Sequence, residues 1–350
     1  MSSARIGKRL RAHLRIAMVG LALAVSWPPP ATAASATLAA VQARGTLRCG
    51  VSEGIAGFSK QDAGGRWVGL DVDFCRAVAA ATLGDAEKVT LVPLRASARF
   101  PALAIGNVDL LLRNTTWTLS REAGLGVLFA GVLLYDGQGF MVDADARIDS
   151  ATQLSGTTVC VEKGTTHIDR LSDWARGTRL SVTPLVLDSA PDAAMAFFDG
   201  RCAAYSSDVS TLAAARAEAP RGRAFTILPE QISKEPLGPA VRGGDDQWFT
   251  LVRWVLFALI AAEEADLSQT TVGALRNSAD PAAARVLGAD QELSRLLGVP
   301  PEWSLRAVQS VGNYGELFER NLGSGSPLRL DRGVNRPWNR GGIMYAPPLR

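Results

Sequence analysis

Short runs of apolar and β-branched residues alternate with helical patterns along most of the chain. In the first third, such runs at 46–51, 88–94 and 108–112 are separated by amphipathic patterns at 71–83 and 100–105. The run at 108–112, VDLLL, is almost entirely apolar, which is typical of a parallel strand that is covered on both faces. This order of elements predicts an α/β domain built on a parallel sheet.

The same alternation begins again near residue 150. The pattern therefore predicts two α/β units of similar size in tandem, at 45–140 and 145–235. The apolar runs of the second unit are at 157–161, 181–187, 202–205 and 225–228, and its helical patterns are at 165–175 and 191–198.

Two extended segments connect these units. Residues 137–142 lead out of the first unit and residues 236–241 lead back. Two such crossings indicate two lobes joined by a two-stranded hinge, with the chain returning to the first lobe. We expect a first lobe of residues 34–140 plus 240–350, which ends in a C-terminal extension, and a second lobe of residues 141–239.

The first 33 residues have the three parts of a secretory signal peptide. Five basic residues precede an apolar run at 16–27, three prolines follow it, and Ala31-Thr32-Ala33 has the small-x-small form of a cleavage site. A membrane anchor is the alternative interpretation, but 12 apolar residues are too few to span a bilayer. We therefore expect a signal peptide at 1–33, and export of the protein to the periplasm.

Cleavage of this segment changes the charge of the protein. The whole chain has 37 Lys and Arg against 34 Asp and Glu, a formal net charge of +3. Five of the basic residues and none of the acidic ones lie in the first 33, so the mature chain has 32 basic and 34 acidic residues. A slightly acidic chain gives no electrostatic reason to expect a nucleic-acid partner.

The chain has four cysteines, Cys49, Cys75, Cys160 and Cys202. An oxidising compartment favours their pairing, and four cysteines allow three connectivities that the sequence alone does not separate. We favour Cys49–Cys75 with Cys160–Cys202, because each pair joins neighbouring elements of one α/β unit. A structural zinc site is the alternative, but there is no CxxC spacing and His167 is the one histidine after residue 33. We expect no metal.

Common catalytic motifs are missing from the sequence. There is no GxxxxGK[ST] phosphate loop, no GxSxG, no HExxH and no GxGxxG after a predicted strand. His167 could serve in a Ser-His-Asp triad, but its surroundings, GTTHIDRL, favour a partly exposed histidine in the first turn of a helix. Binding is therefore favoured over catalysis, and we expect no catalytic residue and no cofactor.

Three polar clusters follow predicted strands, where α/β folds place ligands. The first, at 109–121 (DLLLRNTTWTLSR), ends in an arginine that can bind a carboxylate. The second, at 163–166 (KGTT), opens a predicted helix and suits an anion, and the third, at 206–208 (SSD), supplies a carboxylate. Each cluster also has a simpler interpretation. The first would be a capped helix start with a surface arginine, the second a threonine N-cap and the third an aspartate N-cap. Together they suit a ligand with an α-carboxylate and an α-ammonium.

Long strings of the chain carry a family resemblance that includes these clusters. They are 69–79 (GLDVDFCRAVA), 109–121, 136–142 (DGQGFMV), 161–166, 200–208, 232–249 (ISKEPLGPAVRGGDDQWF), 311–321 (VGNYGELFERN) and 341–350 (GGIMYAPPLR). They resemble the solute-binding proteins of polar amino-acid ABC transporters (family 3), and the C-terminal strings are similar to the general L-amino-acid-binding periplasmic proteins within it. The resemblance implies a type II periplasmic-binding-protein fold, whose two α/β lobes close on one amino acid.

The resemblance also assigns roles to single residues. It implies that Arg121 binds the α-carboxylate with help from Thr116 and Thr165. Asn114 and Asp208 would then hold the α-ammonium.

Two positions depart from the family pattern. Ile55 stands where specific relatives carry an aromatic lid over the ligand, which fits a pocket of broad specificity. Arg113 stands where many relatives have a small residue, so we expect it to narrow the pocket or to favour acidic side chains.

The resemblance further implies the partners of the chain. These are an L-amino acid and the permease subunits of an ABC transporter, which work with a cytoplasmic ATPase. We expect a monomer that is not embedded in the membrane. The alternative function is a periplasmic dehydratase on the same scaffold, for which Glu53 and His167 are the candidate acid or base.

Overall fold

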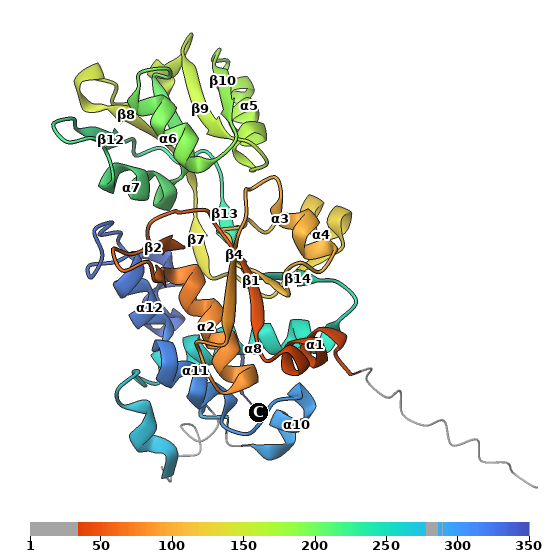
Figure 1. Ribbon diagram of the computed structural model, residues 1–350. Coiled ribbons are helices and arrows are strands. Elements are labelled where there is room, and N and C mark those ends of the chain that lie inside the picture. The colour runs from red at the N-terminus through yellow and green to blue at the C-terminus, as the bar shows by residue number, and fades with distance from the viewer. Residues whose placement is uncertain (1–33, 278–285, 289, 350) are drawn as a thin grey trace, which may run out of the picture. The chain divides into compact units, whose positions relative to one another are not determined.

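Two five-stranded sheets form the framework of the computed structural model, which describes residues 34–277, 286–288 and 290–349 (Figure 1). The expected signal peptide at 1–33 lies outside the described residues. The strand order of the first sheet is β4-β1-β5-β14-β6. Its strands are β1 (Leu47–Val51), β4 (Val89–Pro93), β5 (Leu110–Leu111), β6 (Val127–Phe129) and β14 (Ala240–Arg242).

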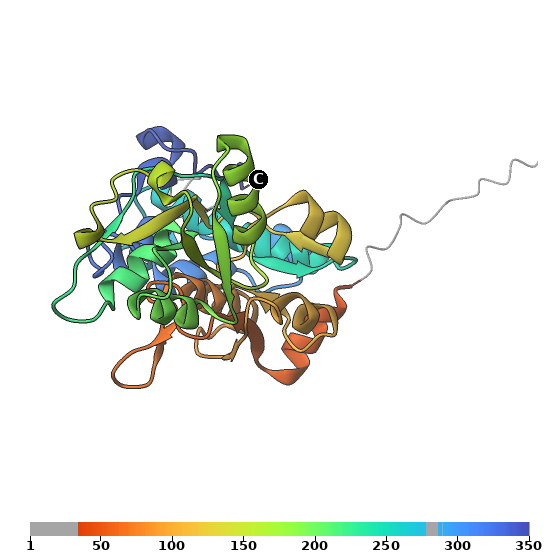
Figure 2. The same cartoon turned by 90° about the horizontal axis from the view of Figure 1, so that it is seen from above.

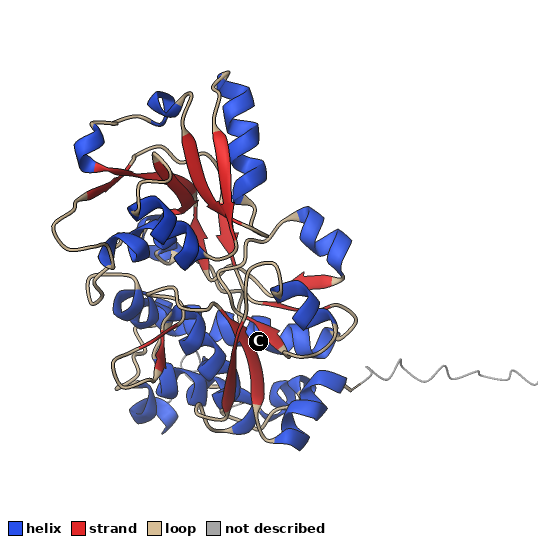
Figure 3. Cartoon of the chain, turned by 45° about the horizontal axis from the view of Figure 1, so that its top comes forward, coloured by secondary structure: helices blue, strands red, loops and turns tan. Residues whose placement is uncertain are grey.

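The first sheet is mixed. Strand β1 pairs in parallel with β4 and β5, as the apolar runs predict, while β14 pairs antiparallel with β5 and β6. Strand β14 runs the other way because it brings the chain back from the second sheet. Helices lie on both sides of this sheet (Figure 3). They include α1 (Ala36–Arg44), α2 (Leu70–Leu83), α3 (Arg99–Ala104), α4 (Leu119–Leu125) and α8 (Asp246–Glu264).

Helix α2 is the central helix of this lobe. Every residue from Leu70 to Thr82 is buried, because the helix lies between β1 and the later helices α8 and α11 (Trp303–Val311). A helix that is covered all round needs apolar or small residues on every face, and the AVAAAT segment of α2 supplies them. Gly84 then ends it in a left-handed conformation.

The second sheet has the strand order β10-β9-β11-β8-β12. Strand β9 pairs in parallel with β10 and β11, and β8 pairs antiparallel with β11 and β12. Its strands are β8 (Gln138–Asp143), β9 (Thr158–Glu162), β10 (Thr183–Leu187), β11 (Ala204–Asp208) and β12 (Phe225–Ile227). The helices of the second lobe are α5 (His167–Thr178), α6 (Ala190–Phe198) and α7 (Val209–Ala217). Two 3-10 turns, η1 (Ala144–Ala146) and η2 (Ala151–Leu154), lie between β8 and β9.

Two short strands form a separate antiparallel pair at the points where the chain passes from one sheet to the other. Strand β7 (Leu134–Asp136) pairs with β13 (Glu235–Leu237), with Asp136 opposite Glu235. The sequence placed the outward crossing at 137–142, but those residues form β8 of the second sheet. There the side-chain amide Nε2 of Gln138 donates to the carbonyl oxygen of His167 and to the hydroxyl of Ser206, and β8 pairs with β11 and β12. The two-stranded hinge therefore lies a few residues earlier, and the expected lobe limits at 140 and 240 stay predictions.

Both expected disulfides are confirmed. Cys49 of β1 is bonded to Cys75 of α2, with 6.2 Å between the Cα atoms. Cys160 of β9 is bonded to Cys202, which precedes β11, with 5.6 Å between the Cα atoms. Each bond joins elements of one lobe and closes a loop of 26 or 42 residues. Closure of loops of that size stabilises the fold by about 3–4 kcal/mol each in the chain-entropy model.

The C-terminal extension packs on the first lobe and on the hinge. It contains the short helices α10 (Gln291–Leu297) and α12 (Tyr314–Asn321), and the 3-10 turns η4 (Gly333–Asn335) and η5 (Trp338–Arg340). Its tail buries Leu328 and Met344, and Arg332 pairs with Glu263 of α8. The side chain of Asn335 accepts from the backbone N–H of Tyr135 in β7 at 2.7 Å and donates to its carbonyl oxygen at 2.9 Å. The extension thus holds the hinge strand directly.

The remaining elements are peripheral. The hairpin of β2 (Lys60–Gln61) and β3 (Trp67–Val68) projects as a loop from the surface (Figure 2). The turn η3 (Val272–Asn277) follows α8. In the described part of the chain, every helix is too short or too polar to span a membrane.

Candidate functional site

The polar clusters that the sequence predicted lie at the ends of central strands in both sheets. Arg113 and Asn114 follow β5 of the first sheet, while Glu162 ends β9 and Asp208 ends β11 of the second. Direct contacts join the two groups: the amide of Asn114 donates to the hydroxyl of Thr211 at 3.5 Å, and Arg113 pairs with Glu162. The structure therefore brings the clusters to one place between the lobes.

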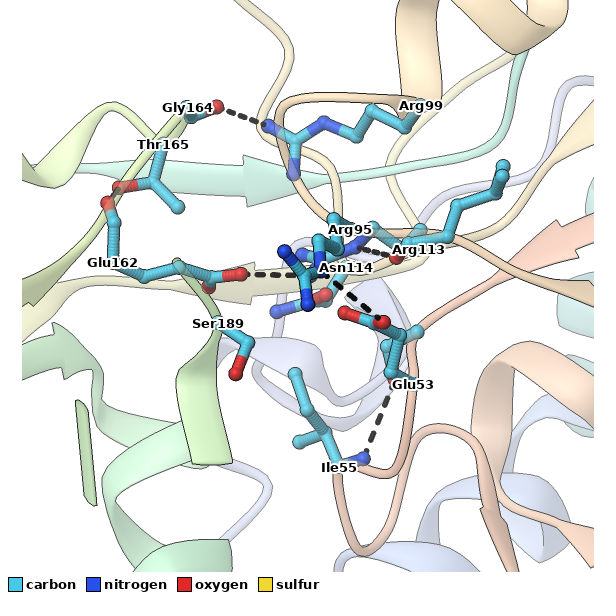
Figure 4. Close-up of polar contacts among 12 residues, drawn as sticks. Glu53, Ile55, Arg95, Arg99, Arg113, Asn114, Glu162, Gly164, Thr165 and Ser189 are labelled. Atoms are coloured by element: carbon cyan, nitrogen blue, oxygen red, sulfur yellow. Dashed lines mark hydrogen bonds and ion pairs between the residues drawn. The ribbon is translucent and has the colours of Figure 1, made fainter. Parts of the chain in front are cut away.

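Arg113 forms a fully buried ion pair across the lobes. Its Nη2 donates to Glu162 Oε1 at 2.8 Å and its Nε donates to the carbonyl oxygen of Leu94 at 2.9 Å (Figure 4). The two charged side chains are 2% and 3% exposed. Glu162 was missed by the sequence analysis, although a carboxylate at the end of the apolar run TVCVE is an unusual residue for a buried strand.

Asn114 adopts a backbone conformation that few residues tolerate. Its φ is +32°, and its N–H donates to a carboxylate oxygen of Asp71 at 3.0 Å. Burial raises the pKa of Asp71 to about 7, against the lowering effect of the Asn114 N–H and of Arg113. The side-chain oxygen Oδ1 of Asn114 is buried and accepts no hydrogen bond from the described residues. It remains available as an acceptor in the site.

Arg121 lies in the first turn of α4, where the side chain of Thr118 caps the helix by accepting from the Arg121 N–H. Its guanidinium is buried, and Nη1 donates to the carbonyl oxygen of Thr116 at 2.6 Å. Burial lowers its pKa to about 10, and the carboxylates of Glu235 and Asp208 oppose that effect. Among the described residues, no carboxylate comes within ion-pair distance of Arg121, so its remaining donors are free for an anion.

A second buried arginine, Arg99, begins α3 close by and was not expected from the sequence. Its side chain points toward the loop of Gly164 and donates from Nη2 to the Gly164 carbonyl oxygen at 3.4 Å (Figure 4). The guanidinium carbons of Arg99 and Arg121 lie 5.1 and 5.3 Å from the ring centre of Phe100, so one aromatic ring contacts both. Burial and the nearby cations Arg121 and Arg113 lower the pKa of Arg99 well below its usual value.

The loop between β9 and α5 faces these arginines. The hydroxyl of Thr165 donates to the Glu162 carbonyl oxygen at 2.7 Å and accepts from the His167 N–H at 3.3 Å. The hydroxyl of Thr166 donates to Glu235 of the hinge at 2.9 Å. Thr165 is half-buried, so its side chain shapes the loop at the edge of the site.

The expectation of a partly exposed His167 is wrong. Its side chain is buried, and Nε2 lies 3.0 Å from Asp208 Oδ1. Burial lowers the pKa of His167, but Asp208, together with Glu235 and Glu162, raises it above its ordinary value. The histidine is buried because β11 places Asp208 beneath the first turn of α5, a contact between residues 41 apart that no local pattern reports. Asp208 also does not cap α7 with its side chain, as the simpler interpretation had it.

Comparison with known proteins supplies the identity of this arrangement. Residues 47–272 match the model of the bacterial extracellular solute-binding proteins, family 3. The chain belongs to this family. The family resemblance of the sequence and the type II periplasmic-binding-protein fold are thereby confirmed.

Individual relatives of this solute-binding protein cover nearly its whole length. The general L-amino acid-binding periplasmic protein AapJ of Rhizobium johnstonii is 48% identical over 323 residues, which are 91% of this chain and 95% of that protein. The glutamate/glutamine/aspartate/asparagine-binding protein BztA of Rhodobacter capsulatus is 44% identical over 319 residues, 91% of this chain and 94% of that one. An ABC transporter periplasmic binding protein from Brucella ovis, solved with glutathione bound, is 46% identical with a TM-score of 0.87, and the match covers 90% of this chain and 99% of that one. The expected periplasmic location is confirmed by these relatives.

The structure places most of the predicted ligand-binding residues of this solute-binding protein at the strand ends. Arg121, Thr116, Asn114 and Asp208 are gathered with Arg113 around the strand ends described above. Ile55 is buried against a cavity of about 70 Å³ that is lined from both lobes and includes Thr211, the partner of Asn114. Ala190, Tyr205 and Thr211 line its far side.

Proposed function

We propose that this solute-binding protein binds L-amino acids between its lobes and delivers them to the permease of an ABC importer. The single observation that carries the proposal is the pair of opposite charges at the site. Arg121 is buried with free donors, and Asp208 is buried at the end of β11. A zwitterion offers one carboxylate and one ammonium, and each must meet a partner of opposite charge once water is excluded.

The roles of the side chains follow from their chemistry. The guanidinium of Arg121 has five donors in a planar fork, of which the structure uses Nη1 on the Thr116 carbonyl, so the rest suit the α-carboxylate. The free acceptor of Asn114 and the carboxylate of Asp208 suit the α-ammonium. The half-buried Thr165 adds a hydroxyl at the edge of the site.

Closure of the lobes is the proposed mechanism. The hinge pair β7–β13 is short, so a few residues would absorb the change in backbone angles. In the closed form, Arg113 and Glu162 meet across the lobes and exclude water from the ligand. The closed form is then the one that the permease recognises. We propose that the protein does so as a monomer, with a first lobe of residues 34–140 plus 240–350 and a second lobe of residues 141–239.

The relatives support this proposal. AapJ and BztA are named for binding amino acids, and they align with more than nine-tenths of the chain. Ile55 in place of an aromatic lid favours broad rather than narrow specificity, since an aliphatic side chain cannot stack on a ligand as a ring does.

The dehydratase alternative finds less support. Its two candidate catalytic groups are engaged elsewhere: Glu53 lies 3.7 Å from Arg95 in a partly exposed ion pair, and His167 is held by Asp208. The relatives that align with nearly the whole chain are named as binding proteins, which favours binding over this alternative.

Calorimetric titration of the mature protein tests the proposal. The protein is unfolded and refolded to remove bound ligand, and is then titrated with the twenty L-amino acids, several D-isomers and glutathione. We expect micromolar or tighter binding of several L-amino acids, with weaker binding of the D-isomers. Failure of the whole panel to bind would overturn the proposal, and turnover of any compound would favour the enzyme.

A further inference from the structure

Four titratable side chains form a cluster beside the hinge. His167 opens α5 and Asp208 ends β11, and Nε2 of the histidine lies 3.0 Å from Oδ1 of the aspartate. Asp136 and Glu235 lie opposite each other in the hinge pair β7–β13. The side chains of His167, Asp208 and Glu235 are each at most 3% exposed. We call these four residues the hinge cluster, in which three carboxylates surround one imidazole.

Asp136 has only neutral partners in this cluster. It accepts from the backbone N–H groups of Gly137 at 2.8 Å and Ser210 at 3.1 Å. In the described part of the chain, no basic side chain lies within ion-pair distance of Asp136. Burial and the nearby carboxylate of Asp208 therefore raise the pKa of Asp136 to about 7.

The imidazole of His167 has a hydrogen-bond partner at one nitrogen only. Burial lowers its pKa, but the carboxylates of Asp208, Glu235 and Glu162 raise it above the ordinary value. Its Nδ1 is buried and has no partner among the described residues. An imidazolium carries a proton on each nitrogen, so the charged form leaves the Nδ1–H without an acceptor. Its charge therefore depends on the surrounding carboxylates, and a second cation beside them favours the neutral form.

A cavity behind the hinge connects the cluster with solvent. It has a volume of about 690 Å³ and is lined by Asp136 and Glu235 from the hinge strands, and it opens outward because the lining residues Lys234 and Asp331 are exposed. A proton that leaves Asp136 can therefore reach water. The other charged or titratable groups that line this cavity are Tyr135, which is half-buried, and Arg332, which is paired with Glu263.

We propose that an amino acid whose ammonium binds at Asp208 displaces a proton from the hinge cluster to solvent, so that the protein binds its ligands more tightly as the pH rises. This inference rests on the proposed function, which places the ammonium at Asp208, and adds its regulation by pH. The ammonium keeps its own three protons, and the proton that leaves comes from His167 or Asp136. Because these groups interact, the loss belongs to the cluster rather than to one residue.

The charge of the ammonium sets the direction of the effect. A positive charge beside Asp208 lowers the proton affinity of His167 and of Asp136 alike. The complex then binds fewer protons than the free protein, and by linkage the affinity rises with pH where the cluster titrates. A purely structural role is the competing account. In that case His167 and Asp208 only hold α5 on β11, and no proton moves when a ligand binds.

Calorimetry in buffers of different ionisation enthalpy measures the displaced proton directly. The refolded mature protein is titrated at pH 7.5 with L-glutamine, whose side chain does not titrate, in phosphate, HEPES and Tris. The observed heat should vary with the buffer as expected for release of about 0.3–1 proton per ligand, and the Kd should fall about threefold or more from pH 6 to pH 8. Should L-glutamine not bind, the tightest-binding L-amino acid with an uncharged side chain replaces it.

A double variant tests the origin of the proton. Asp136→Asn combined with His167→Gln removes both groups that can release it, and this protein should bind L-glutamine with release of less than about 0.1 proton. Asp169→Asn, which removes an exposed carboxylate from the first turn of α5, is the matched control. It should release as many protons as the wild type.

The ring signals of His167 give a readout that needs no variant, because it is the one histidine of the chain after residue 33. In NMR spectra, the midpoint of its protonation should move to lower pH when the protein is saturated with L-glutamine. Heats that do not depend on the buffer, uptake of protons, undiminished release by the double variant or an unchanged midpoint of His167 would each overturn the proposal. Absence of binding by every L-amino acid would instead contradict the proposed function, which keeps the two failures distinct.

Discussion

The imidazole Nε2 of His167 lies 3.0 Å from Oδ1 of Asp208, and both side chains are buried. The histidine opens α5 and the aspartate ends β11, so the contact fixes the helix on the strand that bears the proposed ammonium site. Asp208 raises the pKa of His167 above its ordinary value, which favours the charged imidazolium beside this carboxylate.

His167→Gln should destabilise the ligand-free protein more at pH 6 than at pH 9. Glutamine keeps a donor but not the charge, and the stabilisation from a raised histidine pKa is present at low pH and lost as pH rises through that pKa. The loss of unfolding free energy should therefore be greater at pH 6 than at pH 9. Chemical denaturation at the two pH values measures it, and equal losses would contradict a raised pKa of His167 in the folded protein.

Asp71→Asn should stabilise the protein at pH 8 and leave it unchanged near pH 4. The pKa of Asp71 is raised to about 7 by burial, so the folded protein favours the protonated acid and loses stability as pH rises from about 4 to 7. Asparagine keeps an acceptor for the Asn114 N–H without the charge. The gain in unfolding free energy at pH 8 should be roughly 2–4 kcal/mol.

The exposed Asp85→Asn is the matched control for this variant, and it should leave the dependence of stability on pH as it is in the wild type. A gain in Asp71→Asn of the same size at pH 4 and pH 8 would contradict the assignment of the effect to charge burial.

The Arg113–Glu162 pair should behave as one unit in a double-mutant cycle. Arg113→Met or Glu162→Gln alone leaves an uncompensated buried charge and should cost about 3 kcal/mol of unfolding free energy. The double variant leaves no such charge, so its loss should be smaller than the sum of the single losses by about 2 kcal/mol. Strict additivity, measured by chemical denaturation, would mean that the two side chains do not meet in solution.

Asn335→Ala should destabilise the protein, because it removes a contact between the C-terminal extension and the hinge strand β7. It removes both hydrogen bonds from the C-terminal extension to the backbone of Tyr135, and the unfolding free energy should fall by about 1–3 kcal/mol. Asn339→Ala, at an exposed position of the same extension, is the control and should change stability by less than about 0.5 kcal/mol. Equal stability of the two variants would show that the Asn335 hydrogen bonds to the hinge strand do not stabilise the protein.

The sequence predicted the fold well where the signal is local. Apolar runs such as 108–112 marked strands, and the pairing of Cys49 with Cys75 followed from the order of elements in one lobe. The outward crossing was placed a few residues too late, because the strand-like run at 138–143 pairs with β11, whereas the expected return at 236–241 overlaps β13. The antiparallel direction of β14 was likewise not predictable from its own residues, because it results from the return of the chain from the second sheet to the first.

The site was only partly predictable for the same reason. Arg113, Asn114, Arg121 and Asp208 follow strands in the sequence, so their position at the strand ends could be inferred. The contacts that define their electrostatics could not, since they join residues far apart, as in the pairing of Arg113 with Glu162. Arg99 begins the short helix α3, and its contact with Gly164 joins residues 65 apart in the chain, which no local pattern reports.

The central claim is that a zwitterion is held in the cleft by Arg121. Its most direct test is titration of refolded Arg121→Met with the amino acid that binds the wild type most tightly, with Arg176→Met on the exposed face of α5 as the control. The account predicts that the Kd rises on the order of 100-fold or more, because the α-carboxylate then loses its charge-assisted partner, while the control binds like the wild type. Retention of wild-type affinity in Arg121→Met would contradict the account.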